Sequence, residues 1–169
     1  MDSVFKSFWK TVLLTTLIVG INDLILAFTM QSIRTGQFPS KMLLYMAGGA
    51  LGLERSMAGG FWTGALGLLF HFFISFSFTV LVFLLFPLLK LYRFNKLWLL
   101  LFSCIHTIFV NVWMRYVVIP LTLLPPQKPL RLSNIWPGWP IFALIFSFPI
   151  FLIASKYYRT KKVKKEYQY

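Results

Sequence analysis

The chain has 169 residues, of which 58% are hydrophobic and only 12% are charged. A soluble domain of this size has too little polar surface to cover such an apolar fraction, so composition excludes an ordinary soluble fold and indicates a membrane protein. The net charge is +13. No compact soluble basic domain is present to read a nucleic-acid groove, and nucleic acid is therefore not an expected partner.

Four apolar stretches are long enough to cross a bilayer, because a helix needs about 20 residues to span the hydrocarbon core. We predict an all-α fold, a single domain in which four transmembrane helices form an up-down bundle. The predicted spans are residues 11–30, 61–86, 97–119 and 139–155, with a basic tail at 156–169. We expect the first stretch to be an uncleaved span and not a signal peptide, because no A-x-A-type cleavage site follows it.

A shorter apolar, glycine-rich segment lies between the first two spans, at Met42–Leu53 (MLLYMAGGALGL). It is too short to cross the membrane. The sequence predicts a helix here that either lies at the interface or partly re-enters the lipid, and both alternatives stay open.

The distribution of Lys and Arg predicts the orientation of the bundle. An up-down bundle places the N-terminus, the loop before the third span and the tail on one side of the membrane, and these segments hold eleven Lys and Arg residues. The two loops on the other side hold five. The positive-inside rule then puts both termini in the cytoplasm. We expect the tail to bind anionic lipid headgroups, with partner docking as the alternative. The tail residues expected to do so are Lys161, Lys162, Lys164 and Lys165.

One face of the second span carries small residues. Gly60, Gly64 and Gly67 share this face with His71 and Ser75, because steps of three and four residues stay aligned on a helix. The three glycines are expected to let neighbouring helices approach closely. Such a stripe allows a homodimer, or docking in a larger membrane complex, without requiring either.

Several polar side chains fall inside the predicted spans, where they are costly unless they are paired or hydrated. They are Asn22, Asp23, His71, His106, Asn111 and Arg115. At about 1.5 Å of rise per residue, both histidines come out near the middle of the membrane, and the others lie in its outer half or near the outer interface.

These residues allow several interpretations. We favour a polar pocket or pathway for an ion, a proton or a small solute, in a transport protein or an accessory subunit of a membrane assembly. A second is haem b or metal ligation by His71 and His106, although no cofactor is favoured. A third is a purely structural role, in which Asp23 and Arg115 form an ion pair completed by Asn111. A further alternative is an enzyme acting on a lipid, with Asp23 and a histidine as acid–base groups. No nucleophile motif or H-E-x-x-H run is present, so no catalytic residue is predicted and an enzyme is not expected.

The order of features resembles a family of small, uncharacterised four-span proteins of the bacterial inner membrane. Three segments carry the resemblance: GINDLILAF at Gly20–Phe28, GLERSMAGGFWTGALGLLFHFFISF at Gly52–Phe76, and VNVWMRYVVIPLTLLPP at Val110–Pro126. It implies a multi-pass protein of the bacterial cytoplasmic membrane and carries no activity with it. The matching positions are Asp23, His71, Asn111 and Pro120.

Overall fold

The computed structural model describes residues 2–126 and 138–166, with side chains over 6–126 and 138–160. Every regular element in these ranges is helical, which confirms the predicted all-α fold. The side chains of Lys161, Lys162, Lys164 and Lys165 lie outside the described residues. The prediction that they bind lipid headgroups therefore stays a prediction.

Four helices of the described chain are long and apolar enough to cross a membrane. They coincide with the four predicted spans to within a few residues at most ends. The first is Lys6–Thr35, within α1 (Asp2–Thr35), and the second is Phe61–Leu88, which is α4. The third, Lys96–Leu121, begins with α5 (Lys96–Trp113). The fourth, Trp139–Thr160, consists of α7 (Trp139–Phe142), a π-helical segment and most of α8 (Phe148–Glu166). The last helix thus continues through much of the predicted tail.

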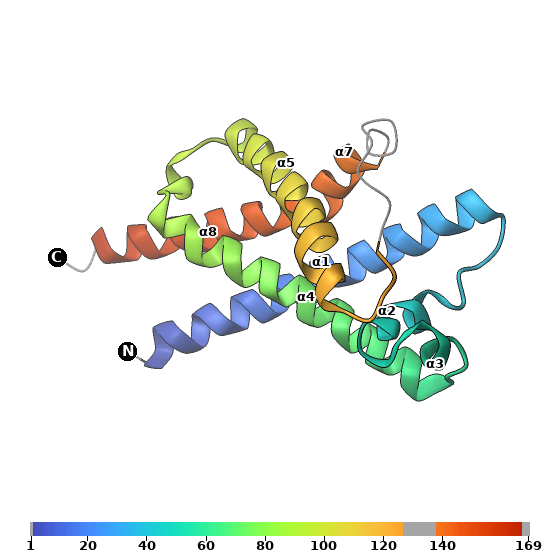
Figure 1. The fold of residues 1–169 in the computed structure, drawn as a ribbon. Coiled ribbons are helices and arrows are strands. Elements are labelled where there is room, and N and C mark those ends of the chain that lie inside the picture. The colour runs from blue at the N-terminus through green and yellow to red at the C-terminus, as the bar shows by residue number, and fades with distance from the viewer. Residues whose placement is uncertain (1, 127–137, 167–169) are drawn as a thin grey trace.

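The short apolar segment forms the predicted helix, α2 (Met42–Leu51), and a second short helix follows it, α3 (Leu53–Met57). Gly52 separates them with a φ of 79°, a left-handed value that favours glycine. Both helices lie beside the N-terminal end of α4, away from the chain termini (Figure 1). Leu123 donates a backbone hydrogen bond to the Gly49 carbonyl and so fastens the chain beyond α5 to this α2–α3 hairpin.

Prolines explain where the long helices depart from α geometry. Proline has no N–H, and its ring clashes with the carbonyl four residues earlier. Pro120 follows the π-helical segment Met114–Val118, and Pro149 follows the π-helical segment Ala143–Ser147. In each case the residue four positions before the proline lies inside the π turn, which is wide enough to relieve the clash.

Pro87 lies inside α4, near its C-terminal end, and is accommodated differently. It cannot donate to the Phe83 carbonyl, one turn earlier. The Tyr158 hydroxyl of α8 donates to that carbonyl instead, at 2.7 Å, and the Tyr158 ring stacks on Phe86. A neighbouring helix thus satisfies the backbone group that proline frees, as a segment without access to water requires.

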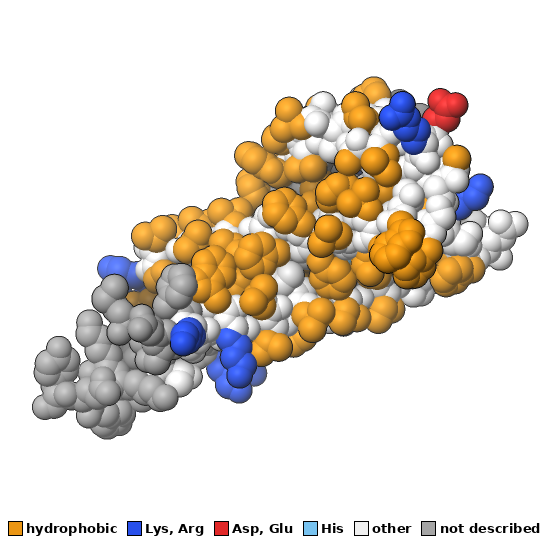
Figure 2. Space-filling model, turned by 90° about the horizontal axis from the view of Figure 1, so that it is seen from below, with side chains coloured by type: hydrophobic (Ala, Val, Ile, Leu, Met, Phe, Trp, Pro, Cys, Tyr) orange, Lys and Arg blue, Asp and Glu red, His pale blue; other side chains and the backbone are white. Residues whose placement is uncertain are grey.

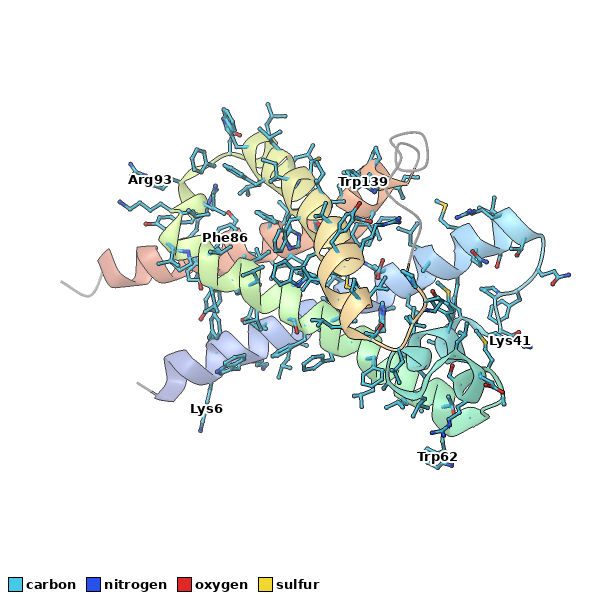
Figure 3. All side chains as sticks on the ribbon, viewed as in Figure 1. Lys6, Lys41, Trp62, Phe86, Arg93 and Trp139 are labelled. Atoms are coloured by element: carbon cyan, nitrogen blue, oxygen red, sulfur yellow. The ribbon has the colours of Figure 1, made fainter. Side chains whose placement is uncertain are left out.

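The two chain ends lie at the same end of the molecule, as the up-down arrangement predicts (Figure 1). Lys6 and Arg93 project at this end, and Lys41 and Trp62 lie at the opposite end (Figure 3). Between the ends, apolar side chains cover most of the visible face, with Lys and Arg near both extremities (Figure 2). An apolar belt between charged ends is the surface expected of a bilayer-spanning bundle.

Candidate functional site

An acid and a histidine meet between α1 and α4. The His71 Nδ1 lies 3.9 Å from the Asp23 Oδ2, within ion-pair distance and longer than a hydrogen bond. His71 is 8% exposed and Asp23 is 21% exposed. The sequence predicted both residues as members of one polar cluster, and the structure brings them together.

The other nitrogen of His71 is also engaged. Its Nε2 donates a hydrogen bond of 2.8 Å to the backbone carbonyl of Gly20, one turn before Asp23. A carbonyl oxygen can only accept, so the hydrogen must be on Nε2. The position at which His71 can gain or lose a proton is therefore Nδ1, and this atom faces the carboxylate.

Gly20 lies against an aromatic ring of α4. A Cβ at this position would lie 2.6 Å from the Phe72 ring, next to His71 in the chain. The Phe72 ring in turn lies edge-on to the imidazole, with centroids 5.4 Å apart. Gly20 was not predicted as part of the site; the signal was a glycine on the same helical face as Asp23.

The Asp23–His71 pair lies deep in the bundle. At about 1.5 Å of rise per residue, each of the two residues is within about one turn of the midpoint of its candidate span. A charged side chain that faced the lipid at this depth would be energetically costly. A position between two helices avoids that cost.

The second histidine forms a separate hydrogen-bonded cluster. The His106 Nδ1 lies 2.9 Å from the Ser147 hydroxyl, which in turn lies 2.8 Å from the Thr107 hydroxyl. Ser147 is fully buried and belongs to the π-helical segment Ala143–Ser147. The His106 Nε2 is buried without a hydrogen-bond partner, and the ring is surrounded by Phe78, Phe109 and Phe151.

The two histidines were predicted at one level as joint ligands in the haem alternative. Their hydrogen bonds lead to different helices, α1 for His71 and the π-helical segment of 143–147 for His106. Over residues 2–126 and 138–166, no group of three or more His, Cys, Asp or Glu side chains is placed to hold a metal ion. Ser147 and Thr107 were not in the predicted set, because a lone hydroxyl in a span gives no distinctive sequence signal.

The remaining predicted residues lie elsewhere along the helices. Asn111 is half-buried and donates through Nδ2 to the Thr107 carbonyl of its own helix. Asn22 is half-buried beside Asp23 in α1. Arg115 is half-buried in the π-helical segment Met114–Val118. The Asn111 bond stays within its own helix and does not reach the Asp23–His71 pair.

The glycine face of α4 packs on α2, one turn from His71. A Cβ at Gly67 would overlap the backbone carbonyl oxygen of Leu43 and lie 3.2 Å from the Ala47 nitrogen. A Cβ at Gly64 would lie 4.0 Å from the Leu43 Cβ, which is ordinary contact. Gly60 differs from the prediction, because nothing lies within 4 Å of an added Cβ there. The close approach thus depends on Gly67.

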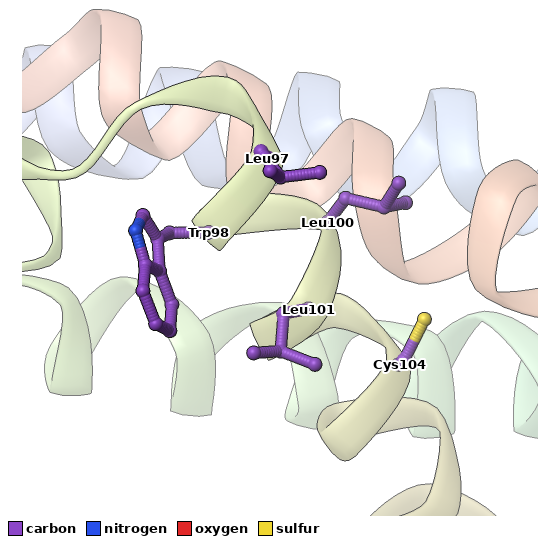
Figure 4. A pocket seen from close by; sticks show the side chains of 5 residues that line it. All are labelled: Leu97, Trp98, Leu100, Leu101 and Cys104. Atoms are coloured by element: carbon purple, nitrogen blue, oxygen red, sulfur yellow. The ribbon is translucent and has the colours of Figure 1, made fainter.

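A shallow apolar hollow lies along α5, and neither histidine lines it (Figure 4). Its volume is about 340 Å³. The lining residues are Leu97, Trp98, Leu100, Leu101 and Cys104. With no ionisable acid or histidine among them, this hollow is a surface for apolar groups and not an extension of the Asp23–His71 pair.

Four apolar helices with polar groups turned inward and charged ends define a multi-pass α-helical membrane protein. No protein-family profile matches the chain, and neither the curated proteins nor the solved structures yield a match. A functional assignment therefore rests on the site itself.

Proposed function

We propose that this protein transports an ion or a small solute across the membrane, with protonation of the Asp23–His71 pair as the coupled step. The observation that carries the proposal is the intramembrane pair itself, in which the Gly20 carbonyl accepts the hydrogen bond from Nε2 and leaves Nδ1 facing the carboxylate. Ionisable groups inside membrane helices are costly to retain, and they commonly mark ion and proton pathways.

The protonation states of the pair differ strongly in energy. If both groups are deprotonated, the Nδ1 lone pair faces an anion, which is unfavourable where the dielectric constant is low. One additional proton, on either Asp23 or Nδ1, removes that conflict and yields a neutral pair or an ion pair. Uptake and release of this one proton by the pair is the proposed coupled step.

The proposed location is the cytoplasmic membrane of a bacterium, with both termini in the cytoplasm. The resemblance to four-span inner-membrane proteins supports the membrane. The excess of Lys and Arg in the segments next to the termini supports the orientation.

We expect Asp23→Asn to abolish proton flux into proteoliposomes. Asparagine keeps the size of the side chain but cannot carry the charge or the proton, so the pair loses its transferable proton. Flux is measured with pyranine inside vesicles under an imposed pH gradient and a potassium diffusion potential. The matched control is Glu54→Gln, which removes an exposed carboxylate near the membrane end and should leave flux unchanged.

The same preparation separates the competing functions. Equal flux in wild type and Asp23→Asn, or no flux from folded wild-type protein, would contradict the proposal. Co-purification with a larger complex in the absence of flux would instead identify an accessory subunit. A Soret band that disappears in both His71→Ala and His106→Ala would identify a haem protein.

A further inference from the structure

The turn between α4 and α5 presents three cations at one end of the bundle. Lys90, Arg93 and Lys96 are all exposed. Lys90 has a φ of 52°, which reverses the chain after α4, and a single 3₁₀ turn (Leu91–Arg93) follows. The turn therefore gathers three positive charges within seven consecutive residues at the point where the chain re-enters the apolar region.

This basic turn is held in place by contacts with α8 and with the start of α5. Arg159 of α8 donates to the backbone carbonyls of Tyr92 and Phe94. The Asn95 side chain caps α5 by accepting from the Trp98 N–H at 3.1 Å. The Phe94 ring also contacts the Trp98 ring, with centroids 6.1 Å apart. These contacts fix the backbone that carries the three cations, which lowers the ordering cost of binding.

The apolar hollow of α5 begins directly beside these cations. Leu97, the first lining residue, follows Lys96, and Cys104 lies two turns further along the helix (Figure 4). The hollow thus runs about 10 Å from the charged end toward the middle of the span. Trp98 also lines the hollow near its charged end, and tryptophan is enriched at the headgroup level of membranes.

We propose that this end of α5 binds one anionic phospholipid. Its phosphate lies among Lys90, Arg93 and Lys96, and one acyl chain occupies the hollow lined by Leu97, Leu101 and Cys104. The charges match a phosphodiester, and the apolar lining matches hydrocarbon. A protein or peptide occupant is less suitable, because the hollow lies on a membrane span and offers no polar lining group. This site is independent of the transport proposal.

Native mass spectrometry tests this site with the full-length protein. The protein is released from detergent micelles containing equal amounts of phosphatidylglycerol and phosphatidylcholine with identical acyl chains. We expect one retained phosphatidylglycerol molecule, favoured over phosphatidylcholine. The Lys90→Gln, Arg93→Gln, Lys96→Gln triple variant should reduce this preference at least about tenfold, since each cation near a phosphate contributes about fivefold.

The matched control removes three exposed cations from the opposite end of the molecule. It carries Arg34→Gln, Lys41→Gln and Arg55→Gln. An equal loss of preference in this control would show a general effect of net charge and would overturn the proposal, as would an unchanged preference in the first triple variant. Circular dichroism confirms that both variants are folded.

A second variant tests the acyl-chain part of the site. Cys104→Trp places a large ring in the hollow while leaving every cation in place. We expect retention of phosphatidylglycerol to fall at least about threefold, because the acyl chain of the lipid loses its apolar contacts. Unchanged retention in Cys104→Trp would show that the hollow does not hold the lipid and would contradict this part of the proposal.

Discussion

Gly67→Ala is expected to lower the unfolding free energy of the detergent-solubilised protein by about 1–3 kcal/mol, the cost of forcing extra volume into a packed interface. The added Cβ would overlap the Leu43 carbonyl oxygen, which is backbone and cannot rotate away. α2 would have to shift away from α4. The measurement is an SDS titration followed by far-UV circular dichroism.

Gly64→Ala is the matched control, because it makes the same substitution one turn earlier on the same face of α4. There the new methyl group would lie 4.0 Å from the Leu43 Cβ, so no overlap arises. We expect no loss of stability, since alanine is a better helix former than glycine. Equal effects at Gly64 and Gly67 would mean that α2 is not held against α4 as the structure describes.

His71→Leu is expected to destabilise the protein by about 3 kcal/mol, because it leaves the Asp23 carboxyl inside a span without its partner. The double variant His71→Leu, Asp23→Leu should regain most of this loss. Replacing both members of a buried pair by apolar groups is often neutral, whereas removing one is costly.

The same cycle measures the coupling between the two side chains. Unfolding free energies are compared for wild type, both single variants and the double variant. A coupling energy well above the usual experimental error of about 0.5 kcal/mol is expected for groups in contact. Additive effects would contradict an interaction between Asp23 and His71.

The four spans could be predicted because long apolar runs are a direct consequence of bilayer thickness. The end of the last helix could not be predicted in this way, since α8 continues to Glu166 through a basic sequence. Hydropathy marks where a helix leaves the lipid and not where it ends. Lysine is a good helix former, so the helix can continue beyond the membrane.

The site could be predicted only in part. Asp23 and His71 were identifiable, because an ionisable side chain within an apolar run is conspicuous. The Gly20 carbonyl was not, since every residue has a carbonyl and the sequence does not show which one a neighbouring helix approaches. The Ser147 contact of His106 was equally hidden, because it depends on a π-helical segment that precedes Pro149. Interhelical geometry decides both contacts.

The protonation of His71 tests the account most directly. In protein labelled with ¹⁵N-histidine and reconstituted in lipid, solid-state NMR distinguishes protonated from unprotonated ring nitrogens, and a His106→Gln variant assigns the signals. We predict that Nε2 of His71 carries hydrogen at neutral pH, because it donates to the Gly20 carbonyl. An Nε2 without hydrogen at neutral pH would contradict the bond to Gly20 and the proton site built on it.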